Sequence, residues 1–223
     1  MPNLLDPFSL IPLFNLPPSS PQISTFISSL ASSSTPLTPD IKSYSDATYQ
    51  NYYDIGLSLC FLAEKGLDSV DIFNRDPNPP APKPGRTVTV YAPGPQVTIH
   101  FTSTTLILPP RNPKSKSTEP PKSIPRPSSI TFTPSTTGRQ LVSCLGEPSR
   151  KGSGGWTGVW LEWKSVEFKV DEEGNKGQIG IMVELRDPGA AEMTEEMMKK
   201  GMGGVWERAA KWEWKSLKLF KSE

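Results

Sequence analysis

The stretch TYQNYYDIGLSLCFLAEKGLDSVDIFN, residues 48–74, carries the clearest structural signal in the chain. Apolar residues alternate with small or polar residues along 53–61, and the alternation returns along 67–74. A period of two places the apolar side chains on one face of a strand. The stretch therefore predicts a long strand over 48–62, the turn AEKG, and a second strand over 67–74 that pairs with the first as an antiparallel hairpin.

A second pair of strands is predicted at GVWLEWKSVEFKV, residues 158–170, and at QIGIMVELR, residues 178–186. The alternation in the first run slips near Lys164, which indicates a β-bulge at that point. The turn DEEGNKG lies between the two runs. We therefore expect another hairpin in this half of the chain.

A short helix is predicted ahead of each hairpin. Pro21 suits the first turn of a helix over residues 21–31, whose apolar stripe is Ile23, Phe26, Ile27 and Leu30. Thr136 or Thr137 is the predicted N-cap of the second helix, whose apolar face holds Leu141, Val142 and Leu145. Gly146 is the predicted end of that helix, because Pro148 prevents its continuation.

The two halves share the order helix, gap, long aromatic strand, turn and strand, over residues 21–74 and 136–186. A single helix–hairpin unit leaves one face of its sheet exposed, so two units are expected to shield each other. We therefore predict an α+β fold of two αββ units around antiparallel sheet, related by an internal duplication.

Segments rich in proline flank and interrupt these units. Residues 1–20 are expected to form a flexible, apolar arm, and residues 109–129 a disordered basic insertion rich in proline and serine. The first αββ unit, with extra strands at 86–91 and 96–108, then covers residues 21–108.

The second αββ unit covers residues 130–223. Beyond its hairpin we expect a helix that opens at Asp187 and Pro188, with an aspartate cap and a proline at the first position. A final short helix and a last strand ending at Phe220 are expected to complete the chain.

Composition excludes some classes of partner. The chain has 24 basic and 23 acidic side chains and a formal charge of +1, so we expect no bulk attraction to nucleic acid. Cys60 and Cys144 lie in apolar runs and are expected to be buried, reduced thiols. The N-terminal region has no basic start and is interrupted by prolines, which is untypical of a signal peptide or a membrane-spanning helix. We therefore expect a soluble protein of the cytoplasm, or else of the nucleus.

Two segments resemble known families. TTGRQLVSCLGEPSRKG followed by strands resembles the helix, L-G-x-P, strand, strand unit of BamE/SmpA-like small lipoprotein modules. NYYDIGLSLCF and LDSVDIF resemble the N-Y-F-x-L-G-x-x-I-x-F…V-x-x-F segment of the eukaryotic phagosome assembly factor family. The first resemblance implies a protein-binding scaffold, and the second an autophagy-linked adaptor. Neither brings catalytic residues, and the lipidation cysteine of the lipoproteins is absent here.

The loop GEPSRKGSGG, residues 146–155, raises the possibility of a phosphate cradle, since glycine amides and two cations suit an anion. The loop does not match G-x-x-x-x-G-K-[ST], however, and it follows a helix instead of preceding one. The negative end of that helix dipole disfavours an anion. We therefore predict a flexible connection between a helix and a strand.

No catalytic constellation is visible. His100 is the only histidine, so no histidine pair can bind a metal, and a structural or exposed strand histidine is expected. Asp68 and Asp71 are three residues apart and are expected on opposite faces of a strand. The same holds for Glu162 and Glu167 unless a bulge shifts the register. We expect no cofactor and no metal.

All six tryptophans lie in the last third of the chain: Trp156, Trp160, Trp163, Trp206, Trp212 and Trp214. Most are expected to fill the core, because each indole buries a large area. Trp156 follows three glycines and a serine and is the best candidate for an exposed contact.

These patterns favour a non-enzymatic protein-interaction or scaffold module, and the second resemblance implies an adaptor-like role in membrane trafficking or autophagy. The partner is an unidentified protein, and the candidate contacts are Leu10, Phe14, Arg150, Lys151 and Trp156. The alternative is a protein that binds a small ligand or a carbohydrate through exposed tryptophans.

Overall fold

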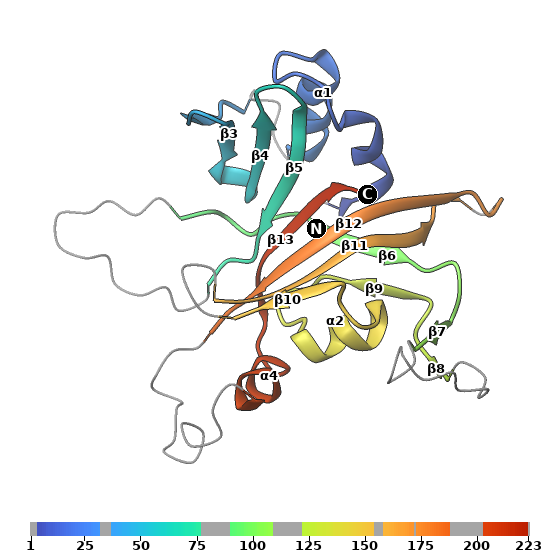
Figure 1. The fold of residues 1–223 in the computed structure, drawn as a ribbon. Helices are drawn as coiled ribbons and strands as arrows, with labels where there is room; N and C mark the ends of the chain where they lie inside the picture. Colours follow the sequence, from blue (N-terminus) through green and yellow to red (C-terminus); the bar gives the residue numbers. More distant parts are fainter. Residues whose placement is uncertain are drawn as a thin grey trace.

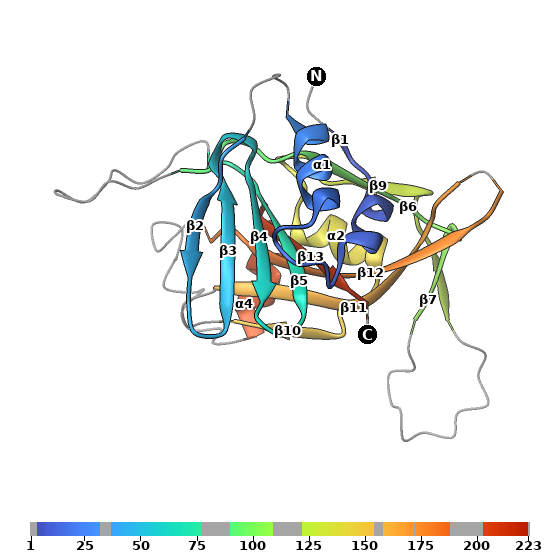
Figure 2. The ribbon, with the colours of Figure 1, turned by 90° about the horizontal axis from the view of Figure 1, so that it is seen from above.

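An eight-stranded antiparallel sheet forms the centre of the computed structural model (Figures 1 and 2). The structure describes residues 4–31, 37–76, 90–108, 122–153, 158–171, 173–187 and 203–222. In chain order, the strands of the sheet are β2 (Asp40–Ser43), β3 (Ala47–Tyr52), β4 (Leu57–Leu62), β5 (Gly66–Phe73), β10 (Arg150–Gly152), β11 (Val159–Lys169), β12 (Lys176–Leu185) and β13 (Trp214–Lys221). Their order in space is β10-β11-β12-β13-β5-β4-β3-β2.

Two four-stranded meanders meet at β5 and β13 in the middle of this sheet. The pairs Ile72–Leu217 and Val70–Leu219 lie opposite each other across the join, and all four side chains are fully buried. Figure 2 shows the strands of the first half running across those of the second half, so the sheet is strongly twisted. The predicted α+β class with largely antiparallel sheet is confirmed.

The apolar face of the sheet, which we call the covered face, packs against the remaining elements in one core. These elements are the 3₁₀ helix η1 (Pro7–Leu13), the helices α1 (Pro21–Leu30) and α2 (Gly138–Leu145), and a small sheet of β1 (Leu4–Leu5), β6 (Gln96–His100) and β9 (Ser129–Thr131). Both ribbon views place α1 beside β4 and β5, whereas α2 packs near β9. A last helix, α4 (Gly203–Ala209), precedes β13.

The local predictions for both helices and for the second hairpin are confirmed. All four stripe residues of α1 are buried. Thr137 caps α2 in a capping box, in which its hydroxyl accepts from the Gln140 amide while the Gln140 side chain accepts from the Thr137 amide. The register between β11 and β12 shifts between Trp163 and Val166, as the slip near Lys164 predicts.

The predicted single strand over residues 48–62 is wrong. A short 3₁₀ turn, η2 (Tyr53–Ile55), divides it into β3 and β4, which pair with each other. Gly56 ends the turn at a φ of 64°, and a Cβ there would collide with the backbone of Ala92 and Gly94. Gln50 and Tyr52 of β3 pair with Leu59 and Leu57 of β4, so the covered side changes from even-numbered to odd-numbered residues at the turn. Tyr53 and Ile55 extend the odd-numbered alternation of β4 back into the turn, and this extension conceals the reversal in the sequence.

The N-terminal arm also differs from the expectation of a flexible segment. Residues 15 and 16 pair with the first hairpin, because the Asn15 amide donates to the Leu67 carbonyl and the Leu67 amide donates to the Leu16 carbonyl. Leu10 is 0 % exposed and Phe14 is 7 % exposed. Leu10 and Phe14 therefore belong to the core of this chain, whereas Leu4 and Phe8 remain exposed. Prolines limit regular structure but do not prevent packing.

The disordered insertion expected over 109–129 is wrong in its last part. Residues 109–121 lie outside the described residues. The segment after them contains β8 (Ser123–Pro125), which forms a hairpin with β7 (Thr105–Ile107), and the start of β9. The strand expected over 96–108 is accordingly two strands, β6 and β7.

Other predicted elements lie partly or wholly outside the described residues. Most of the strand expected at 86–91 lies there, and Val90 and Tyr91 form no strand. The helix expected after Asp187 falls in 188–202, also outside the described residues. The final helix and the final strand correspond to α4 and β13.

Gly66→Ala is predicted to destabilise the protein by about 2–5 kcal/mol, the sum of a left-handed backbone penalty and an overpacking cost. Gly66 has a φ of 74°, and a Cβ there would collide with the backbone of Asn15 and Leu16. Urea unfolding of the purified protein measures the loss.

Gly174→Ala is the matched control. Gly174 has a φ of 89°, and no atom lies within 4 Å of the place where its Cβ would stand, so only the backbone penalty of about 1–2 kcal/mol applies. Equal losses for the two variants would show that the arm does not pack closely against the first residue of β5.

Candidate functional site

The edge strand β10 places the two cationic candidates on opposite faces of the sheet. Arg150 pairs with Glu162, and its guanidinium lies 3.6 Å from the Glu162 carboxylate. Lys151 pairs with Leu161, a core residue, and therefore lies on the covered face. The predicted flexible connection is thus wrong for residues 150–152, and the two cations do not converge on one anion.

Lys151 borders a groove between α2, α4 and the covered face of β11 and β12, which we call the α2–α4 groove. Its volume is about 270 Å³. Leu161 and Leu185 form its buried floor, and its walls are Val142 and Trp206. The remaining lining residues are Gly138, Arg139, Ser143, Glu147, Pro148, Lys151, Ala209 and Ala210.

A glycine lets the two helices approach each other at one end of this groove. A Cβ on Gly138 would lie 2.7 Å from the Ala209 carbonyl oxygen and 2.9 Å from a Leu185 methyl group. The Gly138 amide donates to the Trp212 carbonyl, and the Arg139 amide donates to the Ala210 carbonyl. The residues after α4 therefore satisfy the first amides of α2, which removes them as an anion site.

Charged side chains stand at the rim of the groove. Lys151 Nζ lies 2.8 Å from Glu147 Oε1 and 5.4 Å from the centre of the Trp206 ring. The ammonium group thus joins the carboxylate to the aromatic wall through an ion pair and a cation–π contact. Arg139 is exposed at the N-terminal end of α2. The groove therefore combines an apolar interior with two cations at its mouth.

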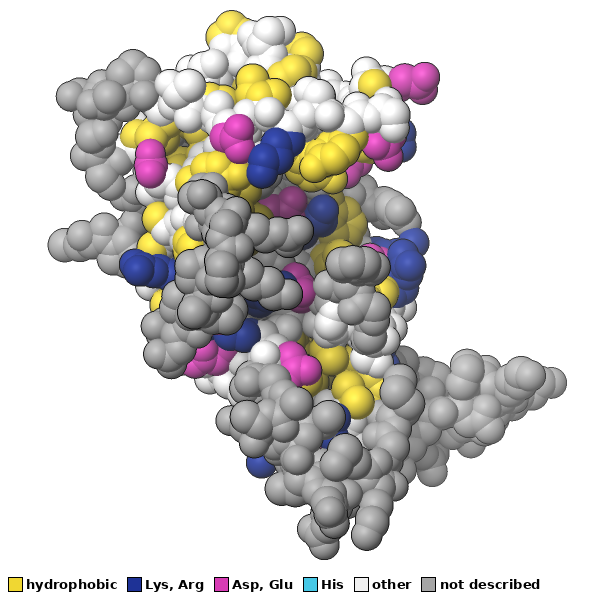
Figure 3. Space-filling model, turned by 90° about the vertical axis from the view of Figure 1, so that its left-hand side faces the viewer, with side chains coloured by type: hydrophobic (Ala, Val, Ile, Leu, Met, Phe, Trp, Pro, Cys, Tyr) yellow, Lys and Arg dark blue, Asp and Glu magenta, His cyan; other side chains and the backbone are white. Residues whose placement is uncertain are grey.

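The opposite, polar face of the sheet, which we call the open face, carries a row of residues that crosses all eight strands. Each member pairs with the next in the register of the sheet. From β10 to β2 the row is Arg150, Glu162, Met182, Lys218, Asp71, Ser58, Asn51 and Asp40. Figure 3, which views the side of β2 and β3, shows acidic and basic side chains beside one another among apolar ones.

Aromatic rings lie flat on the open face at two glycines. A Cβ on Gly152 would lie 2.6 Å from the Trp160 indole, and one on Gly180 would collide with the Phe220 ring. Tyr91 stacks on Phe73 at 3.8 Å between ring centres. The absence of side chains at both glycines lets the rings cover the neighbouring strand.

The centre of the open face buries an acidic group. Burial raises the pKa of Asp71 above its usual value, while Lys218, whose Nζ lies 3.6 Å from the carboxylate, lowers it in part. Asp68 raises the Asp71 pKa further. Asp68 lines the same hollow of the open face as Met182 and Lys218, so the expectation that Asp68 and Asp71 face opposite ways is wrong. The register of β5 against β4 shifts beside Asp68, which removes the simple alternation.

Tyrosine and cysteine side chains beside this centre stay protonated at neutral pH. Burial, with a contribution from Cys60, raises the pKa of Tyr49 to about 12, and burial raises the pKa of the Cys60 thiol. A thiol with a raised pKa is a poor nucleophile. Both cysteines are buried and free, as predicted.

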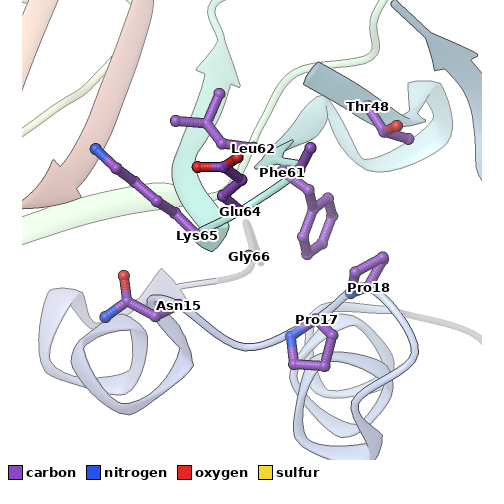
Figure 4. Close-up of a pocket in the computed structure, with 10 residues that line it drawn as sticks. Asn15, Pro17, Pro18, Thr48, Phe61, Leu62, Glu64, Lys65 and Gly66 are labelled. Atoms are coloured by element: carbon purple, nitrogen blue, oxygen red, sulfur yellow. The ribbon is translucent and has the colours of Figure 1, made fainter. Parts of the chain in front are cut away.

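A larger hollow lies between the arm and the turn that joins β4 to β5 (Figure 4). Its volume is about 560 Å³, and Pro17, Pro18 and Phe61 form its apolar wall. The charged residues beside it, Glu64 and Lys65, are exposed on the turn. The hollow is an open depression where the arm meets the hairpin, and it brings no charged groups together on a buried floor.

The structure does not assemble the remaining candidates of the sequence into one site. Leu10 and Phe14 are core residues, and Trp156 lies outside the described residues. His100 is exposed at the end of β6. Glu167 accepts hydrogen bonds from Thr102 and Lys176, whereas Glu162 pairs with Arg150. Of the predicted contacts, Lys151 alone lies at the α2–α4 groove.

Sequence reasoning misses the partners of Lys151. The periodicity predicts Val142 as a core residue of α2, and it groups Trp206 with the tryptophans expected to fill the core. The alternation Arg150–Lys151–Gly152 is too short to predict a strand, and the pairing of α2 with α4 depends on residues far apart in sequence. Gly138, directly after the predicted cap, is the one local signal of a close helix contact.

No family model, no curated protein and no solved structure matches this chain. Within the described residues, no group of three or more histidine, cysteine or acidic side chains is arranged to bind a metal. None of the helices in the described part of the chain is long and apolar enough to cross a bilayer.

Asp71→Asn is predicted to stabilise the protein at neutral pH. A carboxyl group whose pKa is raised by folding costs no stability below its unfolded pKa of about 3.9. The cost grows as pH rises above that value and is complete above the folded-state pKa. We expect the midpoint of thermal unfolding to rise by about 2–4 °C at pH 7, and to be unchanged near pH 3. Differential scanning calorimetry across this pH range measures the shift.

Asp54→Asn, at an exposed position of η2, controls for loss of one negative charge. A destabilised Asp71→Asn protein at pH 7 would mean that the ion pair with Lys218 outweighs the burial cost.

Proposed function

We propose that this chain is a non-enzymatic protein-interaction or scaffold module, and that the α2–α4 groove is its principal contact. The observation that carries this proposal is the preformed apolar groove with Leu161 and Leu185 at its floor and with Lys151 and Arg139 at its mouth. The groove lies at the tryptophan-rich end of the chain, where the sequence predicts contacts.

The size of the groove favours an anchor side chain of a protein partner. Its volume of about 270 Å³ lies just below the range of roughly 300–1,000 Å³ that is typical of small-molecule pockets. Helix-in-groove and peptide recognition place one or a few apolar side chains in such a depression. An interface core of this type also favours tryptophan at its wall.

The charged residues at the mouth of the groove indicate which partner residues can flank an apolar anchor side chain. Lys151 is held by Glu147 and by the Trp206 ring, and Arg139 stands on the first turn of α2. A partner segment with an apolar anchor and a nearby carboxylate would pair with these cations, and such rim charges contribute chiefly to association rate and specificity. We infer that the partner motif is apolar and acidic.

The cellular setting follows from resemblance alone. The likeness of NYYDIGLSLCF and LDSVDIF to the phagosome assembly factor family supports an adaptor role in membrane trafficking or autophagy. We propose this setting for the chain, together with a cytoplasmic or nuclear location.

We also propose that the two meanders descend from an internal duplication. What supports it is the mirrored strand order, in which β2 to β5 and β10 to β13 occupy equivalent places on either side of the central join. A helix precedes each meander, α1 before β2 and α2 before β10. Each proposed repeat is then a helix with four strands, two more than the expected αββ unit.

One observation favours the alternative of carbohydrate or small-ligand binding. The Trp160 indole lies flat on Gly152, next to the edge of the sheet, and is half-buried. A flat indole on a sheet suits the apolar face of a sugar ring.

Proximity labelling in the native cell tests the interaction proposal. Val142→Arg, which places a long side chain in the groove, and Lys151→Glu, which reverses a rim charge, are predicted to reduce labelling of the principal partners by about tenfold. Lys211→Glu is the matched control, since this exposed lysine follows α4 outside the groove lining. Unchanged labelling by both groove variants would remove the groove from the contact.

Titration with oligosaccharides, followed by tryptophan fluorescence, tests the alternative. If the open face binds sugars, the signal saturates and Trp160→Ala abolishes it, whereas Trp206→Ala retains the binding curve. An absence of saturable change in the wild-type protein would dismiss this function.

A further inference from the structure

The edge strand β2 at one end of the large sheet is exposed along its whole length. All four of its residues are exposed, and Ile41 retains 57 % of its accessible surface. Figure 2 shows β2 as the outermost strand beside β3. An exposed strand edge presents unpaired amide and carbonyl groups, and it is a template for a further strand.

The register of β2 against β3 determines which backbone groups face outward. The Tyr44 amide donates to the Ala47 carbonyl, and Lys42 pairs with Tyr49. Hydrogen-bonded pairs alternate along an antiparallel ladder, so the backbone amide and carbonyl of Lys42 also bond to β3. The backbone amide and carbonyl groups of Ile41 and Ser43 therefore point away from β3. Ile41 therefore presents both a donor and an acceptor at the free edge.

We propose that β2 pairs with β2 of a second copy of this chain, antiparallel and with Ile41 opposite Ile41. In this register the outward groups of Ile41 exchange two hydrogen bonds with their counterparts, and the Ser43 amide reaches the Pro39 carbonyl of the second copy. A two-fold axis through Ile41 makes the contact self-complementary, as closed dimers require. The two large sheets become one continuous sheet.

The charges of β2 select this partner and this register. With Ile41 at the axis, Asp40 of each copy lies opposite Lys42 of the other, which gives two attractive cross-strand pairs. A lysine on an edge strand usually discourages pairing, but here the aspartate two residues earlier supplies its complement. A register centred on Lys42 would place two lysines opposite each other, which is unfavourable.

A tyrosine holds both charges in place on the open face. Lys42 Nζ donates to the Tyr53 hydroxyl at 3.1 Å, and that hydroxyl donates to Asp40 Oδ2 at 3.1 Å. Lys42 Nζ and Asp40 Oδ2 themselves lie 3.7 Å apart. The two side chains are therefore ordered before association, which lowers the entropy cost of pairing them with a second copy.

The dimer is expected to be weak, because four residues bury less surface than a standard interface. A dissociation constant on the order of 100 µM is typical of small, transient contacts of this kind. This edge lies at the opposite end of the sheet from β10 and the α2–α4 groove, so the dimer leaves the proposed partner contact free.

Charge-reversal variants test the proposal by sedimentation velocity over a range of protein concentrations. Asp40→Lys and Lys42→Asp each place like charges opposite each other and are predicted to weaken self-association by about tenfold. The double variant, and an equimolar mixture of the two single variants, restore opposite charges and are predicted to associate within about threefold of the wild type. Circular dichroism confirms that each variant is folded.

Cysteine cross-linking tests the register independently. Residues opposite each other in a hydrogen-bonded antiparallel pair have Cα atoms about 5.5 Å apart, within reach of a disulfide. Ile41→Cys is therefore predicted to form a cross-linked dimer under mild oxidation. Ser43→Cys is the matched control, because Ser43 lies opposite Pro39 of the second copy and far from its own counterpart. Cys60 and Cys144 are buried and do not compete.

Two results would overturn the proposal. A wild-type protein that stays monomeric up to about 1 mM, an order above the expected constant, would leave the edge to an extended segment of another protein. A dimer that forms equally well in all charge variants, or that cross-links through Ser43→Cys as readily as through Ile41→Cys, would exclude the register centred on Ile41.

Discussion

The antiparallel pairing of β5 with β13 is the contact on which the rest of the structure depends. It pairs residues 143 to 151 positions apart in sequence, from Ser216–Phe73 to Phe220–Ser69. Asn74, directly after β5, reinforces it. The backbone amide of Asn74 donates to the Lys215 carbonyl. The side-chain amide of Asn74 is buried and donates to the carbonyl groups of Pro134 and Trp214. Without this join, each meander would expose an apolar edge and half a core, because neither has enough covering elements of its own.

The join of β5 with β13 creates one sheet with two faces and two edges, and the two faces differ in their side chains. The covered face, between α2 and α4, provides an apolar groove with Lys151 at its mouth. The open face consists of charged, polar and flat aromatic side chains across eight strands. Because neighbouring residues of a strand face opposite ways, Arg150 and Lys151 contribute to different surfaces although they are adjacent in sequence.

Several errors of sequence interpretation share one physical cause. Apolar periodicity reports which side chains are buried and does not report where the chain reverses, so β3 and β4 read as one strand through Gly56. Proline content reports limited hydrogen bonding and does not report packing, so Leu10 and Phe14 read as parts of a flexible arm. The rule that residues three apart on a strand face opposite ways fails at a bulge, which is why Asp68 and Asp71 share the open face.

The sequence by itself determined the local features of this protein: α1, α2 with its cap, the hairpins β4–β5 and β11–β12, the bulge in β11 and the burial of both cysteines. These depend on periodicity and capping chemistry among near neighbours in the chain. Only the tertiary structure decided the joining of β5 to β13, the approach of α2 to α4 at Gly138, and the meeting of Lys151 with Trp206. Such contacts arise between segments far apart in sequence, because each must bury its apolar surface against whichever element completes the core, and no local pattern encodes that choice.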